Sequence, residues 1–210
     1  MKKYDKSKFF NITEFTDYKL NYWAVPKCGC TAVKAALAKQ KIFDESSTDY
    51  YYIHHNLNLT YITPSYAEVN GNFNISVVRS PYRRLLALYK HFALRDTERC
   101  LELDPNINLS RVHNLNYFLH YLLDERDLED CNHHFQPIYR FLCSDNFIII
   151  PKLIYDFDED LFSLTHLLKA HGCTLERANV SNMEISLSRS QKSLIADRYY
   201  TDFNLFNFEE

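Results

Sequence analysis

Residues 23–34 read as the end of a strand, a tight turn and the start of a helix. The apolar residues 20–25 suit a short strand, and residues 31–40 contain good helix formers without Gly or Pro. The turn between them holds Lys27 and Gly29. At such a junction the free backbone N–H groups and the positive end of the helix dipole meet, which suits phosphate-like anions. The stretch therefore predicts an anion site after a strand of an α/β fold.

This turn differs from the phosphate loop of nucleotide triphosphatases, in which two glycines precede the Lys. Here Lys27 comes before Gly29, so the loop is shorter. Lys27 adds a mobile positive charge, and Thr31 is expected to cap the helix and to offer a hydroxyl donor. The alternative is an ordinary buried strand-to-helix junction whose Lys faces solvent.

A second junction of this kind lies at residues 77–89. The apolar strand ends at Val78, Arg79 follows it, and Pro81 suits the first turn of a helix. A guanidinium at the carboxyl end of a strand suits bidentate binding of a phosphate. The alternative is an amphipathic helix with a solvated basic face.

The rest of the chain alternates between strand and helix patterns. Strands are expected at 73–78 and 147–150, and residues 50–55 are compatible with an edge strand. Helices are expected at 82–94, 115–123, 161–170 and 188–200. This alternation predicts one α/β domain over residues 1–210, with a mostly parallel central sheet flanked by helices and ligands at the carboxyl ends of its strands. Residues 1–19 are expected to be a peripheral polar lead-in.

Composition and hydropathy argue against several classes of protein. The 210 residues carry a formal net charge of −3, so no global basic field attracts nucleic acid. No apolar run reaches the roughly 18 residues of a membrane span, and no signal peptide is visible. We therefore expect a cytoplasmic protein without a transmembrane segment, whose six cysteines are reduced thiols.

Together the two junctions resemble the donor-binding motifs of the sulfotransferases, in particular the membrane-associated carbohydrate sulfotransferases. The loop that binds 5′-phosphosulfate in that family is similar to Pro26-Lys27-Cys28-Gly29-Cys30-Thr31, followed by Lys34. The family's 3′-phosphate motif, Arg-x-Pro-aromatic-x-Arg-Leu-x-Ser-x-Tyr, is matched by Arg79, Pro81, Tyr82, Arg84, Leu85 and Tyr89. The Ser of that motif is Ala87 here, which removes one hydroxyl donor to the 3′-phosphate.

Two later stretches also resemble the carbohydrate sulfotransferases. Residues 132–137, Asn-His-His-Phe-Gln-Pro, resemble a His-aromatic-x-Pro-Gln region, although the Gln expected after the Pro is Ile138. Residues 199–206 resemble a C-terminal Tyr-x-x-Asp-Phe-x-Leu-Phe pattern. The resemblance thus spans roughly residues 20–206.

The resemblance implies a P-loop-like sulfotransferase fold and transfer of a sulfuryl group from 3′-phosphoadenosine 5′-phosphosulfate (PAPS) to a hydroxyl of a sugar or glycoconjugate. The product nucleotide would be 3′-phosphoadenosine 5′-phosphate (PAP). Lys27 would stabilise charge on the leaving phosphate oxygen, so no metal is expected. The residues expected to bind the donor are Pro26, Lys27, Cys28, Gly29, Cys30, Thr31, Ala32, Arg79, Arg84 and Ala87.

The acceptor hydroxyl also needs a base, and a neutral imidazole suits that task near pH 7. Heparan sulfate-type sulfotransferases place a catalytic His upstream of their 3′-phosphate motif, and this resemblance favours His55, with His54 second. His134 in the later motif is expected on the acceptor side. The alternative for each is an ordinary surface or core histidine.

Other interpretations remain open. Cys28 and Cys30 could form a redox pair, and Cys131, His133, His134 and Cys143 could bind zinc, although their spacing fits no common zinc pattern. A nucleotide kinase shares the strand-loop-helix element, but a second glycine and a clear Walker-B Asp are missing. A degenerate, non-catalytic sulfotransferase-like binding protein is the further alternative, prompted by Ala87.

Overall fold

The computed structural model describes residues 11–39, 59–124, 127–128, 131–176 and 184–209. Its chain divides into two compact units. Unit 1 comprises residues 1–78 and 141–180, and unit 2 comprises residues 79–140 and 181–210. The expectation of one domain over 1–210 stays a prediction.

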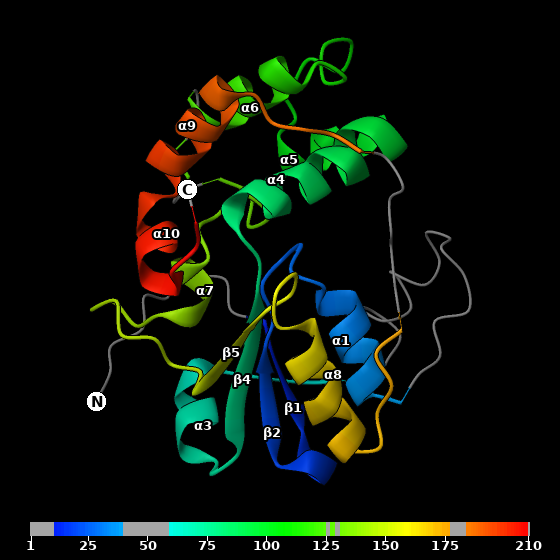
Figure 1. Cartoon of the computed structure of the whole chain (residues 1–210), viewed down its shortest axis with the longest axis vertical. Coiled ribbons are helices and arrows are strands. Elements are labelled where there is room, and N and C mark those ends of the chain that lie inside the picture. Colours follow the sequence, from blue (N-terminus) through cyan, green and yellow to red (C-terminus); the bar gives the residue numbers. More distant parts are fainter. Residues whose placement is uncertain (1–10, 40–58, 125–126, 129–130, 177–183, 210) are drawn as a thin grey trace. The chain divides into compact units, whose positions relative to one another are not determined.

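Unit 1 is built on a sheet that has five strands among the described residues, in the order β3-β1-β2-β4-β5 (Figure 1). Its strands are β1 Ile12–Phe15, β2 Leu20–Trp23, β3 Thr60–Ile62, β4 Phe73–Val78 and β5 Leu153–Asp156. Strands β2, β4 and β5 run parallel, whereas β1 is antiparallel to both β2 and β3. The sheet is therefore mixed, and the expectation of a mostly parallel sheet is wrong.

The antiparallel pair follows from a short connection. A 3₁₀ turn, η1 (Thr16–Tyr18), joins β1 to β2 and ends at Lys19, which has a left-handed φ of 50°. So short a link reverses the chain, because a parallel pair needs a crossover of about a dozen residues or more. Ile12 in β1 is buried. The expectation of a peripheral lead-in at 1–19 is thus wrong for the strand β1, while residues 1–10 lie outside the described part.

The last strand begins later than the sequence pattern predicts. Phe147 has a φ of 56°, and its N–H donates to the carbonyl of Ser144 at 3.0 Å, which makes a turn instead of a strand. Within 147–150 only an isolated bridge between Cys143 and Ile149 forms. The strand β5 starts only after Pro151, which has no N–H to give to a ladder.

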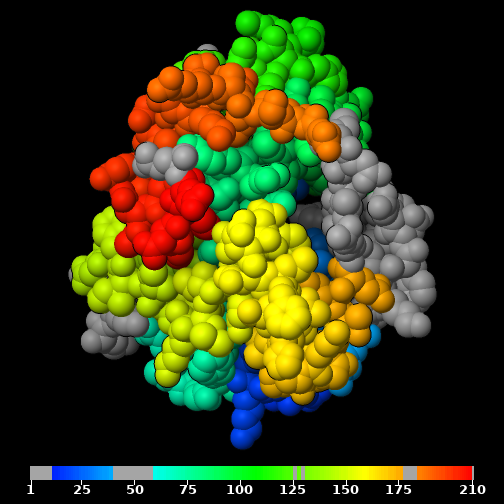
Figure 2. All heavy atoms as spheres, viewed as in Figure 1, coloured from blue at the N-terminus to red at the C-terminus, as the bar shows by residue number. Residues whose placement is uncertain are grey.

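Side-chain alternation gives the sheet of unit 1 two different faces. Its apolar face packs against α1 (Cys30–Leu37) and α8 (Leu161–Ala170), and the residues that share this core include Tyr22, Val33, Ala36, Ile75, Val77, Leu164 and Leu168. Away from this core, α8 lies at the surface of unit 1 (Figure 2). Phe162 of this helix is exposed. On the other face, the amides of Asn21 and Asn74 donate to the carbonyl of Ala67 in α3 (Pro64–Val69).

Unit 2 is helical in its described part and has its own core. Its elements are α4 Pro81–Tyr89, the π-helical segment η3 Lys90–Arg95, the 3₁₀ turn η4 Thr97–Arg99, α5 Cys100–Leu103, α6 Leu115–Leu123, α9 Arg189–Arg198 and α10 Tyr200–Phe206. Helix α9 packs against α4 and α6. The short helix α7 (Tyr139–Leu142) lies where the chain returns to unit 1.

Several elements lie where the sequence predicts them. Strand β4 and helices α6 and α8 match their expected ranges. The helix expected at 82–94 is divided into α4 and the π-helical η3, and the one expected at 188–200 is capped by Ser188 and ends at Arg198. None of the helices described here is both long and apolar enough to cross a membrane.

Candidate functional site

The first predicted site lies in unit 1, in the turn between β2 and α1. The N–H of Cys28 donates to the carbonyl of Val25 at 3.3 Å, which closes the turn. Lys27 and Gly29 both adopt left-handed backbone conformations, with φ of 64° and 75°. Such a conformation strains a residue that has a Cβ, so Lys27 is held by its surroundings and not by its own preference.

Helix α1 begins at Cys30 with Gly29 as its N-cap. Thr31 is therefore a buried residue of the first turn, and the prediction that it caps the helix is wrong. Glycine has no side chain to accept a hydrogen bond from the first N–H groups, so these groups are left to other partners at the positive end of the helix dipole. This is the backbone arrangement that suits an anion.

Phe157, just after β5, has its ring against the turn that contains Gly29. A Cβ added at Gly29 would lie 2.3 Å from Cε2 of Phe157, far inside contact distance. The N–H of Phe157 donates to the carbonyl of Val78 at 2.8 Å, which extends the pairing of β5 with β4. The backbone pairing of β5 with β4 thereby positions Phe157, and its ring lies against Gly29, the residue of the turn that has no side chain. Sequence reasoning missed Phe157, since only its place after a strand could have indicated it.

The other residues of the loop divide into two groups. The side chains of Cys28 and Ala32 are buried, so only their backbone is available to a ligand, whereas Pro26, Lys27 and Cys30 are partly exposed. Both cysteines are free thiols, so the redox-pair interpretation has no disulfide to support it.

Lys34 has a structural place in unit 1. It is fully buried on α1, where its Nζ donates to Oδ1 of Asn11 at 2.7 Å and lies 4.9 Å from the ring centre of Tyr61. Burial lowers the pKa of this amine to about 8. Its ammonium therefore contacts Asn11, just before β1, and Tyr61 in β3.

The second predicted site begins unit 2. Pro81 is the first residue of α4, and the hydroxyl of Ser80 accepts the N–H of Arg83 as a side-chain cap. Arg79 and Ala87 are partly exposed. Arg84 is only 2% exposed, and its Nη2 donates to the carbonyl of His134 at 3.1 Å. This burial argues for a packing role and against the predicted contact of Arg84 with phosphate.

The third predicted region, residues 132–137, and the two residues after it make hydrogen bonds with the C-terminal motif. The hydroxyl of Tyr199 donates to the carbonyl of Phe135 at 2.6 Å. The carboxylate of Asp202 accepts the N–H groups of Ile138 and Tyr139, at 2.7 and 2.9 Å. Burial raises the pKa of Asp202 to about 6, against the opposing effect of these two hydrogen bonds and of Arg84. The two late motifs are thus one structural assembly, and His134 stands within it.

Three further points concern the predicted histidines, metal binding and a groove in unit 2. His54 and His55 lie outside the described residues, so their proposed role stays a prediction. Within the described ranges, no group of three or more His, Cys, Asp or Glu side chains could hold a metal ion. A groove of about 820 Å³ in unit 2, formed by the loop before α6 and by α6 itself, contains none of the predicted site residues.

Comparison with known proteins supplies the family. The model described as "Sulfotransferase family" matches residues 11–209, which is nearly the whole chain. No match was found among curated proteins or among solved structures. A match of this extent decides against the nucleotide kinase alternative. It does not distinguish a carbohydrate sulfotransferase from others, but it establishes that the chain belongs to the sulfotransferase family.

Proposed function

We propose that this protein transfers a sulfuryl group from PAPS to a hydroxyl group of a carbohydrate or glycoconjugate. The main support is the family match over residues 11–209, together with a glycine-capped turn at the position expected for the 5′-phosphosulfate loop. The carbohydrate acceptor rests on the resemblance of the motifs at 132–137 and 199–206 to the carbohydrate sulfotransferases.

The chemistry needs little beyond placement and charge. The acceptor oxygen forms a bond to sulfur while the bond between sulfur and the bridging phosphate oxygen breaks in line, and the electron pair stays on PAP. The proton of the acceptor hydroxyl would pass to a base, the role predicted for His55 or His54. Lys27 and the N–H groups at the start of α1 would stabilise the charge that develops on that oxygen. Because the left-handed turn at Lys27 and Gly29 is already formed, these groups would not have to reorganise during the reaction.

Arg79 would bind the 3′-phosphate of the donor. Its place directly after β4 and before the capped start of α4 gives a short, well-defined segment for a bidentate contact. Ala87, partly exposed on α4, offers no hydroxyl to this phosphate. Arg84 is not assigned to donor binding, because its guanidinium is buried and donates to the carbonyl of His134.

Calorimetric titration of the full chain with PAP, with and without magnesium, tests the donor half of this proposal. We expect binding of PAP that does not require magnesium. ATP titrated in the same way is the control, since a kinase-like site would bind ATP with magnesium and discriminate against PAP. Failure to bind either nucleotide would instead favour a degenerate sulfotransferase-like protein, the outcome that Ala87 makes worth testing.

A further inference from the structure

The groove of about 820 Å³ in unit 2 lies on α6 and on the loop before it. Sites for small ligands usually have volumes of about 300–1,000 Å³, so the groove is of a size to hold such a ligand. The described side chains that line it include an Arg, two Asn and two His, but no Asp or Glu. What the groove can bind depends on which of these groups offer a hydrogen-bond donor to a ligand.

Arg111 supplies the positive charge of the groove. It is exposed, and its guanidinium lies 4.4 Å from the centre of the Tyr117 ring. That ring is itself held, because its hydroxyl accepts the N–H of Asn108 at 3.1 Å and its centre lies 5.6 Å from that of the Tyr121 ring. Within the described ranges Arg111 forms no ion pair. A guanidinium stacked by its face keeps its N–H edges for a planar anion such as a carboxylate.

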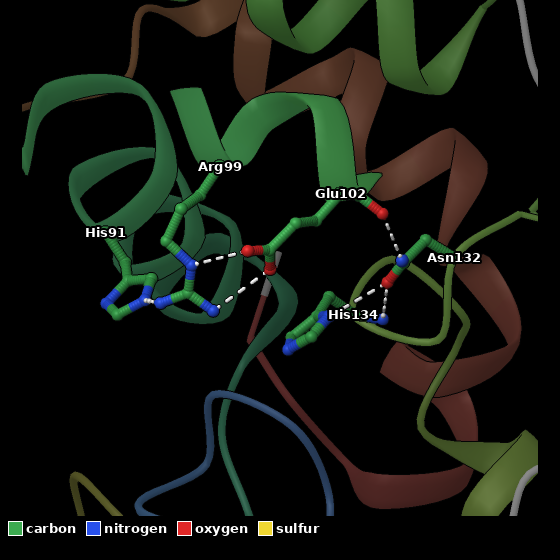
Figure 3. Close-up of polar contacts among 5 residues, drawn as sticks. All are labelled: His91, Arg99, Glu102, Asn132 and His134. Carbon is green, nitrogen blue, oxygen red and sulfur yellow. Dashed lines mark hydrogen bonds and ion pairs between the residues drawn. The ribbon is translucent and has the colours of Figure 1, made fainter. Parts of the chain in front are cut away.

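Another arginine of unit 2 shows the contrasting arrangement. Nε and Nη2 of Arg99 donate to the two carboxylate oxygens of Glu102, each at 3.0 Å (Figure 3). On its other side, Nη1 of Arg99 lies 2.9 Å from Nε2 of His91. The charge of Arg99 is thus compensated by a carboxylate of the protein, whereas that of Arg111 is not. Of these two arginines, Arg111 is the one suited to an anionic ligand.

The two asparagines of the groove have their amide oxygens engaged. Oδ1 of Asn114 accepts the N–H of Tyr117 at 3.1 Å, as the side-chain cap of α6. Oδ1 of Asn116 accepts Nε2 of Gln191 at 2.5 Å, and that amide is oriented because its Oε1 accepts the N–H of Ser188. Neither Nδ2 has a hydrogen-bond partner in the part of the chain that the structure describes. Both asparagines therefore offer a donor and not an acceptor.

These groups define the chemistry of a matching ligand. It must be anionic for Arg111 and must carry further acceptor oxygens for the two amides. The carboxylate of Asp124 does not line the groove and accepts Nδ1–H of the lining residue His120 at 2.5 Å, so it does not oppose the charge of Arg111 there. A sugar residue with a carboxylate meets both requirements, because its ring and hydroxyl oxygens lie beside the charge.

We propose that this groove binds an acidic sugar residue. The carboxylate lies on the guanidinium of Arg111, and neighbouring sugar oxygens accept from Nδ2 of Asn114 and Asn116. The choice of a sugar over other carboxylates rests on the proposed function, because an acceptor polysaccharide would supply it. The proposal thereby narrows the acceptor to acidic polysaccharides. All residues that carry it belong to unit 2.

The first test is calorimetric titration of the full chain, without nucleotide, with tetrasaccharides of glucuronate, galacturonate and mannuronate. Each is compared with its carboxyl-reduced counterpart, which has the same oxygens around the ring but no charge. We expect at least one acidic tetrasaccharide to bind about 10-fold or more tightly than its reduced form. In ¹H–¹⁵N NMR spectra the side-chain N–H signals of Arg111, Asn114 and Asn116 should shift with the same affinity.

Two variants test the donors. Arg111→Ala should weaken binding about 10- to 100-fold, and Arg111→Lys should recover only part of it, because an ammonium lacks the planar fork. Asn114→Asp keeps the cap of α6, since Asp caps as well as Asn, but places an anionic acceptor where the donor was. It should weaken binding without lowering the free energy of unfolding. Arg189→Ala, an exposed arginine on α9, changes the net charge equally and is the control.

The outcomes separate this proposal from the proposed function. Failure of every acidic tetrasaccharide to bind, equal binding of the reduced forms, or wild-type affinity in Arg111→Ala or Asn114→Asp would overturn the groove as a sugar site. Tighter binding of hexaglutamate or of inorganic sulfate would overturn the sugar in favour of a peptide or a simple anion. None of these results touches PAP binding. An acidic sugar bound at Arg111 by a chain that neither binds PAP nor transfers sulfate would instead overturn the proposed function alone.

Discussion

The two strand-to-helix junctions begin their helices by different means. In unit 1 the turn before α1 uses two left-handed residues, Lys27 and Gly29, and has no side-chain cap. In unit 2 the segment before α4 uses Ser80 as a side-chain cap and Pro81 as the first helical residue, with no left-handed residue. The second junction has a side-chain cap of its own, whereas at the first the ring of Phe157 lies close against Gly29.

The difference suggests separate tasks for the two segments. At the first junction the cap residue has no side chain to accept the first N–H groups of α1, and the positive end of the helix dipole suits the part of the donor where charge develops. At the start of α4, which Ser80 already caps, the group that remains to bind a ligand is mainly the side chain of Arg79, just before the cap. We therefore expect changes at the first junction to act through backbone shape and changes at the second to act through single charged contacts.

Gly29→Ala is expected to have the largest effect, because it disturbs the backbone shape of the first junction. The added Cβ would be 2.3 Å from the ring of Phe157 and would force Ala into a φ of +75°. Overpacking costs about 1–3 kcal/mol and a left-handed Ala about 1–2 kcal/mol, so the free energy of unfolding should fall by roughly 2–5 kcal/mol. Urea denaturation measures the loss, and PAP titration should show weakened binding.

Gly71→Ala is the matched control for this change. Gly71 has a φ of +76° but nothing within 4 Å of an added Cβ, so Gly71→Ala has the strain of a left-handed backbone without the collision. Equal losses in the two variants would show that Phe157 does not constrain the turn. A double variant, Gly29→Ala with Phe157→Ala, should relieve the collision but leave the left-handed strain.

These contacts show what sequence could and could not predict. Local patterns predicted β4, α6 and α8, because their apolar spacing and end signals lie within each segment. The pairing of β1 was not predictable from its composition, since it depends on a left-handed Lys19. The contact of Phe157 with Gly29 joins residues distant in sequence, and no local signal encodes it.

The candidate site shows the same division. Motif order located Lys27, Arg79 and His134, but not which side chains reach the surface. Arg83 and Arg84 are neighbours in sequence, yet one is exposed and the other is buried, because successive helix residues point about 100° apart. Only the packing of the helix decides which arginine is available to a ligand.

A third helix start, that of α7, is expected to depend on pH. It is capped from a distance by Asp202, whose pKa burial raises to about 6 from an ordinary value of about 3.9. The folded state then binds this proton more tightly than the unfolded state, so the stability contributed by Asp202 is present at low pH and is lost as pH rises between about 4 and 6. A pKa difference of this size corresponds to roughly 3 kcal/mol.

Asp202→Asn should remove this dependence. We expect the unfolding free energy of the wild type, minus that of the variant, to decrease as pH rises through this window, as measured by urea denaturation at several pH values. Asp197→Asn, an exposed carboxylate on α9, is the control and should show no comparable trend. A difference that stays constant or increases with pH would contradict the raised pKa.

Replacing the charged side chain of each junction by Ala compares the two junctions directly. Arg79→Ala should mainly weaken PAP binding, by roughly 1.5–3 kcal/mol for one lost charged hydrogen bond. Lys27→Ala should mainly lower turnover, because its charge is needed where the leaving oxygen becomes negative. Arg83→Ala, an exposed arginine on α4, controls for general loss of positive charge. Wild-type PAP affinity in Arg79→Ala would remove that residue from the donor site.

The smallest expected effect is a gain, at Ala87. The family motif has Ser at this place, and Ala87 is partly exposed on α4, so Ala87→Ser should tighten PAP binding by about 0.5–1.5 kcal/mol, the net value of one hydrogen bond. Two groups could have replaced the missing hydroxyl, but both have partners within unit 2. Arg84 donates to the carbonyl of His134, and the hydroxyl of Tyr89 donates to the carbonyl of His113 at 2.5 Å.

Ala196→Ser, a partly buried position on α9, is the control for adding a hydroxyl to a helix of unit 2 and should leave the affinity for PAP unchanged. Calorimetry of both variants gives the comparison. Tighter binding only in Ala87→Ser would place the 3′-phosphate at the first turns of α4 and make the second junction a binding element that this chain has weakened. Unchanged or weaker binding would mean that the phosphate does not approach position 87, and the contrast between the two junctions would then rest on Arg79 alone.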